Sequence, residues 1–288
     1  YIPACGEGTL WNPILQECIV AIPADLNFDG CITISDLLEF LPAHGFCPPL
    51  PVFDGDEIEG EWDCVFDPWN CSDPLEYHGY DYATVQVGDQ CWFAENLRTT
   101  EYANGDNIPG QLSDSDWSGT TSGAQAVFGE GEIQCTTGGG FGYPNLPGFD
   151  VCNESTSFQT YGRLYNAYAV IDSRGICPSG WQVSSNESWN VLEDYLVSQG
   201  FAGMESEVLK SSTGWNDGAT GTNNYGFGAL PGGQRTSGGF SYAGGFGRIF
   251  SPIATSYTSA YRDFWTNGTM PTYVASGNDG LSVRCVKD

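Results

Sequence analysis

Hydrophobic and polar positions alternate most clearly around residue 88, where they predict a β-hairpin. Val85 and Val87 alternate with polar neighbours in the run YATVQVGDQCWF, and Gly88-Asp89 interrupts that run. A Gly-Asp pair between two alternating segments is typical of a two-residue hairpin turn. We therefore expect two antiparallel strands that meet at this pair.

A helical period replaces the alternation further along the chain. Trp189, Leu192 and Leu196 recur at i, i+3 and i+7, so they share one face of a helix. Ser185 precedes this run as an N-cap, and Gly200 follows it where a helix would end. We expect a helix over residues 188–199, and a final strand over residues 281–286.

Most of the remaining chain shows neither period. Residues 104–160 are rich in Gly, Ser, Thr and Asn, residues 214–247 are rich in Gly, and we expect long loops in both. Few regular elements and much ordered loop predict an α+β fold. We expect three parts: a cysteine-bracketed module over residues 1–50, a Pro-rich and acidic linker over residues 51–76, and the main domain over residues 77–288.

The charge balance narrows the class of partner. The chain has 288 residues with 36 acidic residues against nine Lys and Arg, so its net charge is -27. Such a surface repels phosphate backbones and anionic lipid, so we expect no nucleic acid as a partner. It has no apolar run of about 18 residues, so we expect no membrane insertion. Two His and two Met leave little for transition-metal chemistry.

The 11 cysteines are spread along the chain rather than grouped as CxxC pairs, which favours disulfides over zinc. Disulfides persist in oxidising surroundings, so we expect an extracellular or cell-surface protein. In the N-terminal module the simplest pairs are Cys5 with Cys18 and Cys31 with Cys47, because short loops close at low entropic cost. The odd count leaves at least one cysteine unpaired, or paired between chains.

One segment of this module has the spacing of a calcium-binding loop. Oxygen-bearing side chains stand at loop positions 1, 3, 5, 9 and 12, with Gly30 at position 6 and a backbone carbonyl at position 7. The alternative is a turn with Asx caps and no ion. We expect Ca²⁺ as the cofactor, with the ligands Asp25, Asn27, Asp29, Cys31, Thr33 and Asp36.

This segment resembles the loop–helix half of a dockerin repeat. A complete dockerin has two such halves, whereas residues 25–46 supply one. We therefore expect the ion to stiffen a small calcium-loop and helix module rather than to support cohesin binding.

A series of short blocks runs through the larger domain. The first, YATVQVGDQCWFAENLR, extends from Tyr82 to Arg98. The later blocks are YGRLYN, ICPSGW, NNYGF, ALPGG and SVRCV, which begin at Tyr161, Ile176, Asn223, Ala229 and Ser282. Together they resemble the Fibrobacter succinogenes major paralogous domain family. The resemblance implies a secreted or surface protein of a Bacteroidota-like bacterium, a loop-rich C-type-lectin-like fold and no established catalytic residues.

A C-type-lectin-like fold implies that the last strand lies near the start of the helix. This placement makes Cys177–Cys285 the natural bridge of the larger domain. Two local pairs are further candidates: Cys64 with Cys71, and Cys135 with Cys152. These pairs leave Cys91 without a partner. We expect it to be a buried free thiol rather than part of an intermolecular disulfide.

Aromatic residues in the Gly-rich loops are candidates for an interface or a glycan site, since aromatic rings serve both. We expect most of them to pack the loops onto the domain and a few to form an interface. The candidates are Phe141, Tyr143, Tyr225, Phe227, Phe240 and Tyr242. The tripeptide Trp215-Asn216-Asp217 matches a calcium-ligating motif of sugar-binding lectins, but it lacks a partner loop and we interpret it as a coincidence.

The sequence contains no recognisable catalytic arrangement. His44 and His78 lack the surroundings of a nucleophile–base pair, and 36 acidic residues always permit some carboxylate pair. We therefore expect a non-enzymatic structural or adhesive subunit of an extracellular assembly or filament. Its expected partners are copies of itself, other surface proteins or glycans. The alternative is a soluble glycan-binding, lectin-like module.

Overall fold

The computed structural model describes residues 9–12, 17–20, 69–131, 145–146, 149–216, 219–252, 259–265 and 268–287. The chain divides into two compact units, Tyr1–Asn70 and Cys71–Asp288. In the first unit, β1 (Thr9–Asn12) and β2 (Glu17–Val20) form an antiparallel hairpin. The predicted calcium loop and most of the predicted linker lie outside the described residues.

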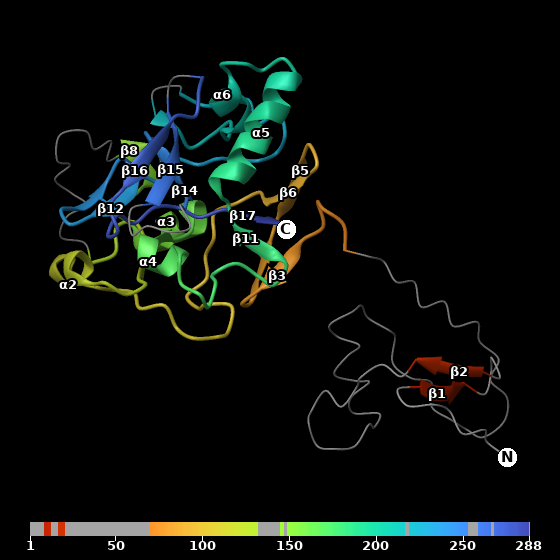
Figure 1. Cartoon of the computed structure of the whole chain (residues 1–288). Helices are drawn as coiled ribbons and strands as arrows, with labels where there is room; N and C mark the ends of the chain where they lie inside the picture. The colour runs from red at the N-terminus through yellow and green to blue at the C-terminus, as the bar shows by residue number, and fades with distance from the viewer. Residues whose placement is uncertain are drawn as a thin grey trace, which may run out of the picture. The chain divides into compact units, whose positions relative to one another are not determined.

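A four-stranded antiparallel sheet in the second unit contains the predicted hairpin (Figure 1). Its order is β11 (Trp181–Val183), β17 (Cys285–Lys287), β6 (Gln90–Phe93) and β5 (Thr84–Val87). Val87 pairs with Gln90, and Gly88 has φ +63°, a conformation that glycine adopts without strain. The hairpin prediction is therefore confirmed at its turn.

The last strand begins later than predicted. Leu281 and Ser282 instead form isolated bridges to Tyr165 and Ile249, so they join two other parts of the domain before the strand begins at Cys285. The final strand predicted over residues 281–286 is thus correct in type, but the prediction started it four residues too early.

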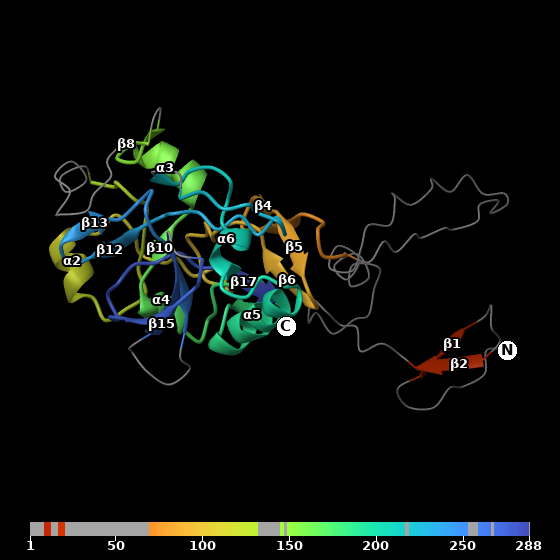
Figure 2. The ribbon, with the colours of Figure 1, turned by 90° about the horizontal axis from the view of Figure 1, so that it is seen from above.

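The predicted helix is α5 (Asn186–Ser198). Ser185 caps it, since its side chain accepts from the backbone N–H of Ser188, and the helix buries Trp189, Leu192 and Leu196 as expected. These three side chains belong to the main core, together with residues from the four-stranded sheet and from a second sheet. Both views show α5 beside the four-stranded sheet (Figure 2).

The second sheet is formed by the C-terminal part of the chain. It consists of β14 (Gly247–Ser251), β15 (Ser259–Phe264) and β16 (Thr272–Ala275), all antiparallel, with β15 in the middle. Ile249 and Phe264 face the main core, so this sheet and the first share one hydrophobic interior.

The rest of the second unit contains several short elements. Some of them lie in the segments predicted as long loops, residues 104–160 and 214–247, which corrects that expectation. The helices are α2 (Asp114–Gly119), α3 (Glu154–Tyr161), α4 (Ala167–Val170) and α6 (Glu205–Leu209). The strands are β3 (Leu75–Tyr77) with β4 (Tyr80–Tyr82), β7 (Gln125–Ala126) with β10 (Leu164–Tyr165), β8 (Asn145–Leu146) with β9 (Phe149–Asp150), and β12 (Gln234–Thr236) with β13 (Gly239–Ser241). These elements are too short to show a period in sequence.

Two disulfides are formed between described residues. Cys177–Cys285 is confirmed, with its Cα atoms 5.9 Å apart. The second bridge is Cys71–Cys91, which corrects both the Cys64–Cys71 pair and the free thiol expected at Cys91. Adjacency in sequence misled here, because the start of the domain folds back onto the hairpin: the backbone N–H of Ser72 donates to Thr84 Oγ1 at 2.9 Å.

Cys152 is also disulfide-bonded, and Cys135, its predicted partner, lies outside the described residues. The other predicted pairs of the N-terminal module fall outside them as well. The second unit is thus a disulfide-bonded α+β domain. Among the described helices none is both long and apolar enough to cross a bilayer.

Candidate functional site

Arginine side chains mark the points where distant loops of the second unit are held together. All seven arginines of the chain lie among the described residues, and each donates hydrogen bonds to oxygen atoms of the same chain. Arginine suits this role because its donors form a planar fork that spans several acceptors at once. The candidate sites of the domain are built around these side chains.

Arg235 on β12 is buried beside α2. Its guanidinium donates to Glu130 Oε1 at 2.5 Å, to the carbonyl oxygen of Leu112 at 2.6 Å and to Asp114 Oδ1 at 3.3 Å. It also lies over the Trp117 ring, 4.5 Å from the centroid. One side chain therefore ties together β12, the start of α2 and the turn that holds Glu130.

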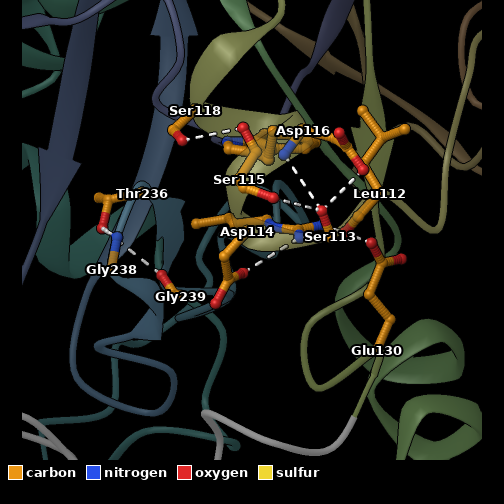
Figure 3. Close-up of polar contacts among 12 residues, drawn as sticks. Leu112, Ser113, Asp114, Ser115, Asp116, Ser118, Glu130, Thr236, Gly238 and Gly239 are labelled. Atoms are coloured by element: carbon orange, nitrogen blue, oxygen red, sulfur yellow. Dashed lines mark hydrogen bonds and ion pairs between the residues drawn. The ribbon is translucent and has the colours of Figure 1, made fainter.

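The start of α2 lies between this turn and the β12–β13 hairpin (Figure 3). Ser113 caps the helix by accepting from the backbone N–H of Asp116 at 3.1 Å. Burial raises the pKa of Glu130, although the Val127 N–H and Arg235 both stabilise its charged form. Because both oxygens of this carboxylate accept hydrogen bonds from the protein, the pair is a structural lock rather than an acid–base couple.

Arg284 is fully buried and has only neutral acceptors. It donates to Asn96 Oδ1 at 2.8 Å and to the carbonyl oxygens of Phe93 at 2.8 Å, Phe227 at 2.7 Å and Gly228 at 2.9 Å. Burial lowers its pKa to about 9, so it stays charged at neutral pH. The arginine of the SVRCV block thus binds both the first block and the NNYGF block.

Arg98 and Arg163 join the first block to the YGRLYN block. Arg163 Nε donates to the carbonyl oxygen of Arg98 at 3.0 Å, and Arg98 donates to the carbonyl oxygens of Phe158 at 2.6 Å and Gln159 at 3.1 Å. Both guanidinium groups lie over the Phe158 ring, at 5.7 Å for Arg98 and 4.9 Å for Arg163. The motif residues that indicated the family therefore stabilise the fold.

Beside these two arginines lies a surface depression of about 350 Å³. It is lined by Val127, Glu154, Ser155, Phe158 and Arg163. A guanidinium, a carboxylate, a hydroxyl and an aromatic ring are the groups that bind a neutral, hydroxyl-rich ligand.

Another arginine site lies on the second sheet. Arg248 packs over the rings of Tyr242 and Tyr261, at 4.8 and 5.3 Å from their centroids, and pairs with Asp263 at 3.3 Å. Burial raises the pKa of Asp263 to about 6 despite this pair. Its second oxygen has no hydrogen-bond partner and is buried, which accounts for the direction of the shift.

The structure places the predicted functional residues in different environments. Phe227 is fully buried in the main core, so it is wrong as a candidate for an interface or a glycan site. Tyr225, Phe240 and Tyr242 are half-buried and pack against other side chains, as expected for most of these aromatics. Trp215 belongs to the main core, and Asp217 of the same tripeptide lies outside the described residues.

The remaining predictions concern residues that the structure does not describe. Phe141, Tyr143 and all six predicted calcium ligands, Asp25, Asn27, Asp29, Cys31, Thr33 and Asp36, lie outside the described ranges. Within those ranges, His, Cys, Asp and Glu side chains form no group of three or more that could hold a metal ion.

Sequence reasoning missed the arginine clusters and the depression. One signal was present: the chain has only seven arginines, and three of them, Arg98, Arg163 and Arg284, stand in the motif blocks. A scarce cation in a strongly acidic chain is most easily explained by a specific internal partner. The identity of those partners depended on contacts between segments 57 to 65 residues apart.

The chain matches no curated protein and no solved structure. The sequence profile of the Fibrobacter succinogenes major domain matches residues 85–287, which include every arginine and all of the four-stranded sheet except Thr84, the first residue of β5. This match covers more than half of the chain, and it contains the blocks whose arginines hold the loops. The chain therefore belongs to the Fibrobacter succinogenes major domain family.

Proposed function

We propose that this chain is a non-enzymatic structural or adhesive subunit of an extracellular assembly. The observation that carries the proposal is the use of its arginines: each one binds oxygen atoms of its own chain and fixes a loop. Cationic side chains that bind internal oxygen atoms make the domain rigid and do not form a substrate-binding centre. Rigid, disulfide-bonded domains suit repeated packing outside the cell.

The same proposal includes a secreted or cell-surface location, a C-type-lectin-like arrangement of the second unit and a calcium-stiffened N-terminal module. The Cys177–Cys285 bridge supports the lectin-like arrangement, since it joins the last strand to the segment before α5. The spacing from Asp25 to Asp36 supports the calcium module. Bound Ca²⁺ would reduce repulsion within residues 1–70, which contain acidic residues but no Lys or Arg.

Electron microscopy of the native protein, with and without a calcium chelator, tests this function. We expect ordered filaments or sheets that loosen when the chelator is added. Dispersed single particles under both conditions would contradict an assembly subunit and leave glycan binding as the leading function.

We propose glycan binding at the depression beside α3 as the second candidate. Phe158 provides an aromatic face there, and Glu154 and Ser155 are exposed polar groups at its rim. Glu154→Gln is the sharpest variant, because it keeps the size of the side chain and removes its charge. Glu187→Gln is the matched control, since Glu187 is also an exposed first-turn glutamate, on α5.

A glycan array identifies a ligand, and calorimetry then measures its affinity for the two variants. We expect Glu154→Gln to weaken binding by about tenfold, which corresponds to about 1.4 kcal/mol, while Glu187→Gln binds as the unmodified chain does. Equal affinities for all three proteins would remove the depression as the glycan site.

A further inference from the structure

The outer strand of the second sheet, β16, has one side with which no strand of the described residues pairs. β16 pairs with β15 through Arg262–Thr272, Tyr261–Tyr273, Ala260–Val274 and Ser259–Ala275. In the described part of the chain no other strand pairs with β16. An open edge of this kind is a template for pairing with another strand.

The register shows which backbone groups face the open side. The Asp263 N–H donates to the carbonyl oxygen of Pro271, so the Arg262–Thr272 pair is of the non-hydrogen-bonded kind. By alternation, the backbone groups of Tyr273 point toward β15. Those of Thr272 and Val274 point outward, away from the sheet.

Side chains on this edge are also exposed. Tyr273 is 45% exposed and Val274 is 70% exposed, the highest value among the large hydrophobic side chains of the described residues. Tyr273 packs on Tyr261 of the neighbouring strand, with ring centroids 5.9 Å apart. The edge therefore offers both hydrogen-bonding groups and apolar surface.

The distribution of charged residues indicates which kind of partner would bind this edge. Residues 264–278 contain no Asp, Glu, Lys or Arg, although the chain carries a net charge of -27. The flanking carboxylates are used internally: Asp263 pairs with Arg248, and Asp279 accepts from the Ser276 N–H at 2.8 Å. A cationic partner would be drawn to the acidic surface elsewhere, whereas an equally acidic partner can approach only where charge is absent.

We propose that β16 is a self-association edge and that its partner is the β16 strand of a second copy of this chain. This inference rests on the assembly function proposed above and names one contact within that assembly. Because the two copies are identical, the strands pair antiparallel about a two-fold axis.

The outward groups determine the register of the pair. Thr272 of one copy exchanges both backbone hydrogen bonds with Val274 of the other, and the reverse exchange follows from symmetry. Tyr273 then faces its own symmetry mate across the axis in a non-hydrogen-bonded pair, where side chains are closest. The two three-stranded sheets become continuous.

Two substitutions at one position test the pairing. Val274→Pro removes an outward N–H but no hydrogen bond to β15, and an edge strand tolerates such a proline. Val274→Asp places like charges on either side of the axis. Val191→Asp is the matched control, because Val191 is 52% exposed on α5 and gains the same charge.

Analytical ultracentrifugation of the full chain measures the monomer–dimer equilibrium. We expect the unmodified chain and Val191→Asp to dimerise reversibly, and both Val274 variants to weaken the dimer by about tenfold or more. The proposal would be overturned by an unmodified chain that stays monomeric up to about 100 µM. It would also be overturned by Val274 variants that dimerise as the unmodified chain does, or by a Val191→Asp variant whose dimer is weakened as much as that of the Val274 variants.

Electron microscopy of the same variants separates this inference from the assembly function. Filaments that persist in both Val274 variants would refute the β16 contact and leave the assembly function standing. Dimers that depend on Val274, without filaments of the unmodified chain under any condition, would retain the contact and refute the assembly.

Discussion

At the scale of single residues, the stability of the second unit depends on buried cations with several acceptors each. Arg284 is the extreme case, because it donates to four neutral oxygens from two segments, residues 93–96 and 227–228, and to no carboxylate among the described residues. Removing such a donor leaves its acceptors buried and unpaired, which costs more than the hydrogen bonds themselves contribute. Arg174 contrasts with it, because its ion pairs with Asp106 and Asp172 lie at the surface.

Substitution of these two arginines tests the contrast. We expect Arg284→Met to lower the free energy of unfolding by about 3–5 kcal/mol, since several buried acceptors lose their donor. Arg174→Met should lower it much less, because ion pairs at the surface contribute little to stability. Urea unfolding under non-reducing conditions measures both, and similar losses for the two variants would contradict the role given to burial.

Asp263 gives the domain a stability that depends on pH. Its pKa is raised from 3.8 to about 6 in the folded state, so between these pH values the folded protein binds a proton that the unfolded chain releases. Stability from this group is therefore greatest at low pH and is lost as the pH rises through about 6. The difference amounts to on the order of 2–3 kcal/mol.

Asp263→Asn isolates this contribution, because asparagine keeps the shape of the side chain and does not titrate. We expect the unmodified chain to gain thermal stability relative to the variant when the pH falls from 7 to 5. Melting curves of both proteins at the two pH values give the comparison, in which all other carboxylates cancel. Parallel pH profiles would show that Asp263 does not titrate in this range.

At the scale of elements, local sequence signals specify some helices and strands, and disulfides join segments that are distant in sequence. The hairpin at Gly88 and the helix α5 each carry a complete signal, a turn pair in one case and a cap with an apolar stripe in the other. The short helices α2 and α3 also have side-chain caps, at Ser113 and Asn153. They are too short to bury an apolar stripe, so nothing in their sequences distinguishes them from loops.

The two disulfides between described residues should differ in their contribution. Cys71–Cys91 closes a segment of 20 residues and Cys177–Cys285 one of 108. On the loop-entropy model these bridges stabilise by about 3 and about 5 kcal/mol. We expect Cys177→Ala with Cys285→Ala to lower the urea midpoint more than Cys71→Ala with Cys91→Ala. Peptide mapping of the unreduced chain checks the pairing itself, and a Cys64–Cys71 peptide would contradict it.

At the scale of the whole molecule, charge is distributed very unevenly. Residues 1–70 contain 13 of the 36 acidic residues and none of the nine Lys and Arg residues. In the second unit the arginines are taken up by internal contacts, and Lys210 donates to the carbonyl oxygens of Ala219 and Trp265. With 36 acidic residues against nine Lys and Arg in the whole chain, mutual repulsion between carboxylates opposes folding and association.

Salt should relieve this repulsion. We expect the melting temperature to rise when NaCl is increased from about 0.02 M to about 0.5 M, because the screening length falls below the spacing of surface charges. Scanning calorimetry at several salt concentrations measures the effect. A melting temperature that falls with salt would show that attractive ion pairs, rather than net charge, dominate the electrostatic energy.

The sequence by itself determined the elements with strong local signals, the acidic character, the family and the Cys177–Cys285 bridge that the family resemblance implied. These depend on neighbours in sequence or on motif blocks. Only the tertiary structure decided that Cys71 pairs with Cys91, that Arg235 locks onto Glu130, and that β16 lies at an edge. The physical reason is that the partners of a cysteine, a buried cation or a strand are selected by long-range packing, which leaves no periodic trace along the chain.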